Sequence, residues 1–326
     1  MNKKFLLVIV LLALIVVGVF TFLLWPEVKL SKIKITDTTI LTSIATEEGF
    51  FKEEGLQVEL TRISSLEDIL PLLLVGEVDY ATFHRLFAKP VIEASLRNAP
   101  LKTIMFAAKH EVYSLVAQPK LKLKDIKTIG IFSRYTSQHY QILKFIENNN
   151  LKIAIIAPKT EEGFWTTEKL QNLLLSGEID AILTLSHGAH QLQSQGFTIL
   201  DVLIDESPSF LSVRNDKIEK KPEEVQKVVR ALEKTMNFIV TSPKETKKLM
   251  LKIWNPERTE ENLNLVNNYY PLIKNAYDRR DVQFDEGAEL LIKIAKAGEF
   301  ETVQEVEEQV VTPEELKKVF DFRFVK

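Results

Sequence analysis

The sequence contains no cysteine, which excludes disulfide bonds, thiolate metal sites, a cysteine nucleophile and a lipid-modified N-terminal cysteine. It has no surplus of basic residues either, since 42 Lys and Arg stand against 45 Asp and Glu and the net charge is −3. Because nucleic-acid binding needs a cluster of Lys and Arg, and none occurs, nucleic acid is not expected as a partner. The apolar share of 45% and the charged share of 27% are typical of a folded protein.

Common catalytic sequences are missing as well. The chain has no Gly-x-Ser-x-Gly, no His-Glu-x-x-His and no Walker sequence, and each of these marks a large class of enzymes. We therefore expect no catalytic residue, no cofactor and no enzymatic activity.

A long apolar run is present at the N-terminus. After Met-Asn-Lys-Lys, residues 5–25 are apolar apart from Gly18 and Thr21. As a helix, a run of this length spans the roughly 30 Å hydrocarbon core of a bilayer. Lys3 and Lys4 precede it, so the N-terminus is expected in the cytoplasm and the rest of the chain outside the cell membrane.

The alternative to a membrane anchor is a cleavable signal peptide. Residues 22–26 are Phe-Leu-Leu-Trp-Pro and offer no small-x-small cleavage site. We therefore expect residues 1–26 to form an uncleaved transmembrane helix, which makes the protein membrane-anchored and extracytoplasmic. Cleavage would instead give a secreted or periplasmic protein, and the body of the chain is exported in both cases.

Behind this segment, short strands alternate with helices. Strands are expected at 32–36, 56–63, 78–81, 102–107, 128–132, 152–157 and 179–184. Helices are expected up to about 48 and at 66–74, 87–96, 136–147 and 168–175. This alternation predicts an α/β fold with mostly parallel sheets and helical crossovers.

An internal echo favours two similar lobes. Residues 72–81 (LLLVGEVDYA) resemble residues 173–181 (LLLSGEIDA). Each segment has the pattern of a helix end, a C-cap glycine, an acidic step and a strand. The aspartates of the echo, Asp79 and Asp180, are expected to be structural residues at strand starts.

From about residue 221 the pattern becomes helical only. Pro222 occupies a first helical position, and apolar side chains follow at helical spacing at 225, 228, 229, 232, 236 and 239. Further helices are expected after Pro243 and at 259–270, 286–297 and 313–320. They are interpreted as amphipathic surface helices.

An ordered set of motifs resembles a known family. Its members are the solute-binding proteins of ABC importers for nitrate, sulfonates, taurine and thiamine-pyrimidine precursors. The motifs are GFFKEEGLQVEL at 49–60, GEVDYA at 76–81, KLKDIKTIG at 122–130, GEIDA at 177–181 and the helix pair at 221–246. The resemblance covers about residues 32–255 in the expected order, whereas the chain beyond about 256 matches no motif of that family.

The resemblance implies a two-lobed type II periplasmic-binding-protein fold, with each lobe a wound, mostly parallel sheet flanked by helices. Lobe one is then expected at 27–117, lobe two at 118–209, and the return to lobe one with the C-terminal helices at 210–326. The chain is expected to cross between the lobes near 113–117 and near 210–213, with the C-terminal helices packed on lobe one.

Ligands of open α/β sheets bind beyond the carboxyl ends of the strands, and four loops meet this rule. They supply twelve candidate ligand-binding residues: Thr38 and Thr39 in the first loop, Thr82, Phe83 and His84 in the second, Ser133, Arg134, Tyr135, Thr136 and Ser137 in the third, and Ser186 and His187 in the fourth. Hydroxyls and free N–H groups at a helix start, together with Arg134, make the third loop the best candidate for an anion.

Each candidate also has an ordinary structural interpretation. Ser133 and Thr136 suit simple N-capping, Phe83 and Tyr135 suit the core, and the loop histidines suit a solvated surface. His187 and His190 lie three residues apart, but two histidines without placed carboxylates do not predict a metal site, so no metal is expected.

The combined prediction is an extracytoplasmic receptor that captures a small polar organic solute between its lobes, with an anionic solute favoured, and delivers it to an ABC permease. The expected partners are the solute, the permease subunits and the membrane, and a monomer is expected. One alternative is a membrane-anchored ligand sensor. A second is an enzyme resembling the pyrimidine-precursor synthases, which share the fold and depend on histidine.

Overall fold

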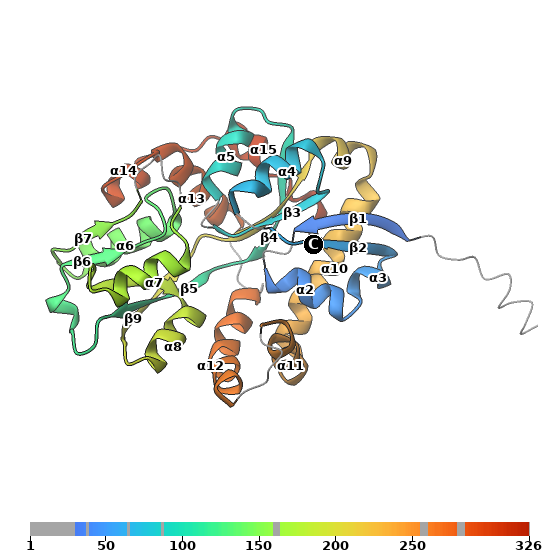
Figure 1. The fold of residues 1–326 in the computed structure, drawn as a ribbon. Coiled ribbons are helices and arrows are strands. Elements are labelled where there is room, and N and C mark those ends of the chain that lie inside the picture. The colour runs from blue at the N-terminus through green and yellow to red at the C-terminus, as the bar shows by residue number, and fades with distance from the viewer. Residues whose placement is uncertain are drawn as a thin grey trace, which may run out of the picture.

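A computed structural model describes residues 30–36, 39–63, 66–85, 88–158, 164–254, 260–278 and 284–325. In this part of the chain, two five-stranded sheets lie beside each other, each flanked by helices (Figure 1). We call the first sheet with its helices lobe one and the second sheet with its helices lobe two.

The sheet of lobe one has the strand order β2-β1-β3-β10-β4. Its strands are β1 (Ser31–Thr36), β2 (Leu56–Thr61), β3 (Tyr80–Phe83), β4 (Leu101–Ala108) and β10 (Ser209–Arg214). β1 pairs in parallel with β2 and β3, whereas β10 pairs antiparallel with both β3 and β4. Four strands therefore share one direction and β10 runs against them.

The sheet of lobe two repeats this plan, in the order β7-β6-β8-β5-β9. Its strands are β5 (Glu111–Ala117), β6 (Thr128–Gly130), β7 (Ala154–Ile156), β8 (Ala181–Leu185) and β9 (Thr198–Asp205). β6 is parallel to β7 and β8, and β5 is antiparallel to β8 and β9. Each sheet is therefore mixed, with one strand running against four.

The chain crosses between the lobes at 109–110, between β4 and β5, and again at 206–208, between β9 and β10. The strand that follows each crossing is the antiparallel one. The sequence placed these crossings near 113–117 and 210–213, yet β5 hydrogen-bonds to β8 and β9 of the second sheet. The local sequence does not reveal this, because β5 is as apolar as a strand of either lobe.

The helices of lobe one come from both ends of the chain. The N-terminal part supplies α2 (Ile40–Glu47), α3 (Phe50–Glu53), α4 (Ile69–Val75) and α5 (Ala88–Leu96). The C-terminal part supplies α9 (Asn215–Lys220), α10 (Pro222–Thr241), α11 (Pro243–Trp254), α12 (Glu260–Tyr277), α13 (Phe284–Ala297), α14 (Val303–Glu307) and α15 (Pro313–Val319). Lobe two has α6 (Ser137–Asn148), α7 (Thr167–Leu175) and α8 (Ser186–Ser194).

Helix α10 packs along α2 and α3 and forms much of the core of lobe one. Pro222 begins it, as the sequence predicts, and its apolar stripe is buried: Val225, Val228, Val229, Leu232, Met236 and Ile239. Burial of such a side chain contributes about 2 kcal/mol, so this stripe is a principal reason that the C-terminal half returns to lobe one.

The internal echo has a physical basis in both lobes. Gly76 and Gly177 have φ angles of 84° and 75°, the left-handed conformation that glycine adopts at a helix end without a steric cost. Asp79 then accepts a hydrogen bond from the amide of Lys34 on β1 at 2.9 Å. Asp180 accepts from the amides of Lys127 and Thr128 at 2.8 and 3.0 Å. Each aspartate thus joins neighbouring strands, which is the structural role expected from the sequence.

The sequence predicted that the C-terminal helices pack on lobe one, but some of them also contact lobe two. Helices α13 and α15 pack on α5, but α12 contacts α8 and α14 contacts α6, and both of these belong to lobe two. Amphipathic spacing shows which face of a helix is apolar but not which neighbour covers that face. The tail from 260 onward therefore contacts both lobes (Figure 1).

Among the described helices, none combines the length and the apolar character needed to cross a membrane. The predicted anchor at 5–25 lies outside the described residues.

Candidate functional site

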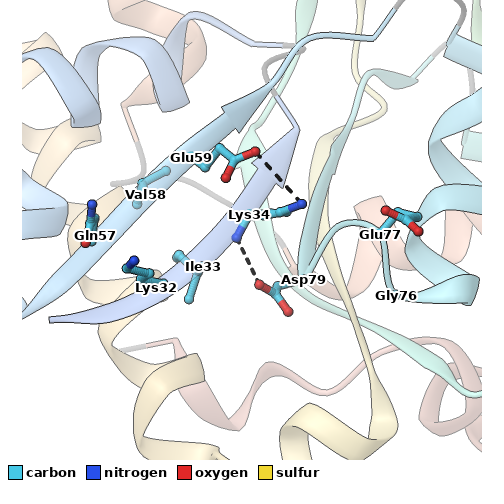
Figure 2. Close-up of a pocket in the computed structure, with 9 residues that line it drawn as sticks. All are labelled: Lys32, Ile33, Lys34, Gln57, Val58, Glu59, Gly76, Glu77 and Asp79. Carbon is cyan, nitrogen blue, oxygen red and sulfur yellow. Dashed lines mark hydrogen bonds and ion pairs between the residues drawn. The ribbon is translucent and has the colours of Figure 1, made fainter.

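A surface hollow of about 430 Å³ lies on the edge of lobe one (Figure 2). It is lined by Lys32, Ile33 and Lys34 of β1, by Gln57, Val58 and Glu59 of β2, and by Gly76, Glu77 and Asp79 before β3. The Lys34 ammonium lies 3.9 Å from Glu59. The turn that lines this hollow precedes β3, so the hollow lies toward the amino ends of the parallel strands, away from lobe two. Solutes of this fold class bind at the opposite ends, so we do not assign the hollow as the solute site.

A group of polar side chains lies where the chain crosses between the lobes, and we call it the junction cluster. It comprises His84 and Arg85 after β3, His110 and Glu111 at the first crossing, Tyr113 on β5, Asp205 at the second crossing, and Tyr269 and Tyr277 on α12. Both lobes and the C-terminal tail contribute to it, and it follows the carboxyl end of β3. The cluster therefore has the position expected of a solute site.

Arg85 is the central residue of the junction cluster. It is only 1% exposed, and its Nη1 donates a hydrogen bond to the backbone oxygen of Asp205 at 3.3 Å. In the part of the chain that the structure describes, Nε and Nη2 of Arg85 have no hydrogen-bond partner. These two nitrogens form one edge of the planar guanidinium, the edge that binds a carboxylate or a similar oxyanion through two parallel hydrogen bonds.

Glu111 supplies a negative charge that interacts with this arginine. Burial alone would raise the pKa of Glu111, but the hydrogen bond from His84 and the charges of Arg85 and His84 outweigh it and lower this pKa to about 2. The distance between His84 Nε2 and Glu111 Oε2 is 3.0 Å. Glu111 is therefore ionised at neutral pH and is already held by His84, which leaves one edge of Arg85 unused.

Aromatic hydroxyls and a second histidine complete the junction cluster. Burial raises the pKa of Tyr113, Tyr269 and Tyr277, so all three phenols stay protonated and can donate hydrogen bonds. The Tyr113 hydroxyl is a buried group without a partner among the described residues. Burial, together with the charge of Arg85, lowers the pKa of His110 to about 4, so its ring is neutral at pH 7.

The third loop, which the sequence favoured for an anion, is occupied by the protein's own side chains. Arg134 donates to both carboxylate oxygens of Glu301 at 3.0 and 2.9 Å and to Ile155 O at 2.8 Å. The Tyr135 hydroxyl donates to Glu299. The Ser137 hydroxyl donates to the buried Asp205 at 2.6 Å. Structural partners therefore use the groups that an anion would need.

The other residues of the third loop act as local supports. Thr136 is the N-cap of α6, and its hydroxyl oxygen accepts from the amide of His139 at 3.2 Å. Ser133 is 1% exposed and accepts from the amide of Tyr135. These are the capping roles that the sequence left as the alternative to ligand binding.

The first two loops give a mixed result. Thr82 is fully buried and hydrogen-bonds to Thr36, with 3.1 Å between the hydroxyl oxygens, and Phe83 stacks on Phe210 at 5.5 Å, so both have structural partners. His84 belongs to the junction cluster. The Thr39 hydroxyl, at the carboxyl end of β1, is buried without a partner in the described chain. Thr38 lies outside the described residues.

In the fourth loop, Ser186 and His187 begin α8, but their side chains lie outside the described part of the structure, as does that of His190. In the described residues, no group of three or more His, Asp or Glu side chains is arranged to hold a metal ion.

Arg85, the central residue of the junction cluster, is not among the ligand-binding residues predicted from the sequence, although it directly follows His84 of the second loop. Glu111, Tyr113 and Asp205 are not among them either. The sequence signal that could have identified Arg85 is the pair of a histidine and an arginine directly after a predicted strand. Nothing local indicated that Glu111 and Asp205 meet them at the two crossings.

Residues 38–246 match the family described as NMT1/THI5 like, which is more than half of the chain. The chain belongs to that family. The family resemblance inferred from the motifs at 49–60, 76–81 and 177–181 is thereby confirmed. No curated protein gives a significant match to the sequence.

Solved structures extend the comparison. The periplasmic aliphatic sulphonate-binding protein of Escherichia coli matches with a TM-score of 0.61 and 16% identity, over 82% of this chain and 86% of that chain. A sulfonate-binding protein of Methylobacillus flagellatus matches at 0.63 and 16%, over 91% and 93%. The periplasmic nitrate-binding protein of Synechocystis matches at 0.50 and 13%, over 69% and 66%. At these identities the likeness establishes the periplasmic-binding-protein fold.

Proposed function

We propose that this protein is the extracytoplasmic solute-binding receptor of an ABC importer and that it captures a small anionic organic solute at the junction cluster. The observation that carries the proposal is Arg85, a buried guanidinium whose Nε and Nη2 edge has no partner among the described residues. The family and the fold supply the class of protein, and the junction cluster supplies the chemistry of the site.

The energetic argument concerns the two unused donors. A buried donor without a partner costs about 1–3 kcal/mol, and a charged one costs more. An oxyanion on the Nε and Nη2 edge accepts hydrogen bonds from both donors and also neutralises the charge of the arginine. A neutral solute can accept the hydrogen bonds but leaves the charge uncompensated. The Tyr113 hydroxyl offers a third donor to the same solute. A carboxylate or sulfonate is therefore the expected anionic group.

Arg85 is almost completely enclosed, so the solute needs a way in. Separation of the lobes at the crossings 109–110 and 206–208 exposes the junction cluster, and closure then removes the bound solute from water. This is a binding cycle with no bond made or broken, so we infer that the protein is not an enzyme.

The expected setting follows from the same class of protein. The apolar segment at 5–25 anchors the receptor in the cell membrane, and a monomer presents its solute to permease subunits beside it. A membrane-anchored sensor would bind solute equally well. Solute uptake by vesicles that contain the receptor and a candidate permease distinguishes the two, because a sensor does not support uptake.

The test is a thermal-stability screen of the full-length protein in mild detergent against sulfonates, carboxylates, inorganic oxyanions, amino acids and pyrimidines. Solute at a hundredfold over its Kd should stabilise the fold by about 2.7 kcal/mol. The variant Arg85→Met should weaken binding of the active compound by about a hundredfold or more, because two charge-assisted hydrogen bonds are lost.

The matched control is Arg134→Met, which removes an arginine of the third loop that already has protein partners and should leave the Kd within a few-fold. Folded protein that responds to no compound, or an Arg85→Met variant that binds as tightly as the parent, would contradict the proposal.

A further inference from the structure

One segment of the tail connects the two lobes without belonging to either crossing. Residues 299–307, which we call the strap, lie between α13 and α15, and both of these helices pack on α5 of lobe one. Within the strap, α14 packs both on α13 and on α6 of lobe two. In Figure 1, α14 of the strap lies beside α13 and above α6 of lobe two.

Three glutamates of the strap bind polar groups of lobe two. Glu301 accepts two hydrogen bonds from Nη1 of Arg134, one at each carboxylate oxygen, and Glu299 accepts from the Tyr135 hydroxyl. Glu307 accepts from the Tyr140 hydroxyl at 3.2 Å. The Arg134 side chain is 29% exposed and that of Glu301 is 72% exposed, so water and salt reach this ion pair.

Apolar contacts reinforce the polar ones. Phe300 is 1% exposed and stacks on the His139 ring of α6, with centroids 4.9 Å apart. A separate apolar cluster forms between the lobes from Tyr140, Leu143, Ile294, Phe300, Val303 and Val306. Burial of Phe300, Val303 and Val306 contributes about 2 kcal/mol for each side chain.

Lobe one also reaches the third loop directly. The Lys89 ammonium of α5 lies 4.4 Å from the centre of the Tyr135 ring, so α5, the strap and the third loop meet at one place. Separation of the lobes on this side must break the contacts of Arg134 and Tyr135 and must withdraw Phe300 from α6.

The contacts of the strap with lobe two favour the state in which the lobes are together. They comprise the stacking of Phe300 on His139 and the hydrogen bonds of Glu301 with Arg134. None of these contacts involves the free edge of Arg85, so they form whether or not a solute is present.

We propose that the strap is an interlobe latch, which holds the two lobes together before any solute binds and must release α6 for the lobes to separate. This goes beyond the proposed function, since a sensor or an enzyme with the same strap would be latched in the same way. The latch makes solute entry depend on the transient release of 299–307.

The test measures the distance between the lobes. Because the chain has no cysteine, Lys52→Cys and Lys124→Cys introduce the only two thiols, one exposed in each lobe, for spin labels. Double electron–electron resonance on the full chain in mild detergent, without solute, then reports the separation. The parent should give one narrow distance.

The latch variant is Phe300→Ala with Glu301→Gln, and the matched control is Phe322→Ala with Glu314→Gln. The control makes the same chemical changes in the tail, but Phe322 contacts Phe106 and Phe320, and Glu314 contacts Lys318, all within lobe one. A second, longer distance should appear in at least half of the latch-variant molecules and should be absent from the control.

A single unchanged distance in the folded latch variant would overturn the proposal. If that variant does not fold, as judged by circular dichroism, the single variant Phe300→Ala decides instead, because it removes the buried contact with His139 and keeps the ion pair of Glu301. A longer distance in that sample supports the latch, and its absence overturns it. Since no solute is used, a failed latch leaves the proposed function standing.

Discussion

Arg85 and Arg134 each follow the carboxyl end of a strand, one in each lobe, yet they differ in burial and in hydrogen bonding. Arg85 is 1% exposed and has one edge without a partner in the described part of the chain, whereas the Arg134 side chain is 29% exposed and has carboxylate and carbonyl partners. The sequence favoured Arg134 for the anion, because hydroxyls and a helix start surround it. The arginine with unused donors is in the other lobe.

The difference shows that the residue type and the loop position do not identify a binding arginine. What matters is whether the folded chain has already satisfied the guanidinium. Glu301 satisfies Arg134 from 167 residues away in the sequence. Glu111, whose charge interacts with Arg85, is hydrogen-bonded to His84 instead.

Acidification should produce the largest effect, because it acts on both regions at once. Burial lowers the pKa of His110 in the junction cluster and of His139 beside the strap to about 4. A lowered histidine pKa means that the unfolded chain takes up the proton first, so stability is lost as the pH falls from about 6.5 to about 4. Each histidine contributes about 3 kcal/mol at most. Urea unfolding at pH 7 and pH 4 measures the loss, and His139→Gln should reduce it by about half.

Below that range a carboxylate adds to the loss. The pKa of Glu111 is lowered to about 2, so its stabilising contribution is complete above about 4.5 and disappears as the pH falls toward 2. A free energy of unfolding that stays constant from pH 7 to pH 3 would contradict the lowered pKa values of the two histidines and of Glu111.

Neutralising the carboxylate beside Arg85 should have the next largest effect. Glu111→Gln leaves a buried guanidinium without this counter-charge and should lower the free energy of unfolding by about 2–3 kcal/mol at pH 7. It should also tighten anion binding, because less negative charge competes for Arg85. Urea unfolding and isothermal titration calorimetry measure the two effects, and weaker anion binding would count against Arg85 as the solute ligand.

The aspartates of the internal echo should matter for stability only. Asp180→Ala removes hydrogen bonds to Lys127 and Thr128 and should cost about 1–2 kcal/mol. Asp79→Ala loses the Lys34 amide and a 2.7 Å ion pair with Lys217 and should cost a similar amount. Both variants should bind solute with the parent Kd. If the Kd changes in one of these variants, the turn that contains the substituted aspartate takes part in solute binding.

The smallest change in stability should come from Glu301→Gln, the counterpart of Glu111→Gln at the other arginine. Its ion pair with Arg134 is exposed to solvent, so the expected cost is below about 1 kcal/mol at pH 7. If Glu301→Gln lowered the free energy of unfolding by about 3 kcal/mol in urea, the carboxylates beside Arg85 and Arg134 would contribute equally to stability, contrary to this prediction.

Much of the fold was predictable because it depends on local pattern. The apolar spacing after Pro222 predicted α10 and its buried face, and Gly76 and Gly177 marked two helix ends. The site was predictable only in part. His84 lies in the junction cluster, whereas Ser137 is bound to Asp205 and the third loop is held by the strap.

The sequence by itself determined the alternation of strands and helices, the two similar lobes and the structural role of Asp79 and Asp180. All of these follow from periodicity and turn chemistry within a few residues. Only the tertiary structure decided which arginine keeps free donors, where the chain crosses between the lobes and which lobe α14 contacts. Those outcomes depend on partners that are distant in sequence, and a buried polar group acquires its role from the groups that remain beside it after folding.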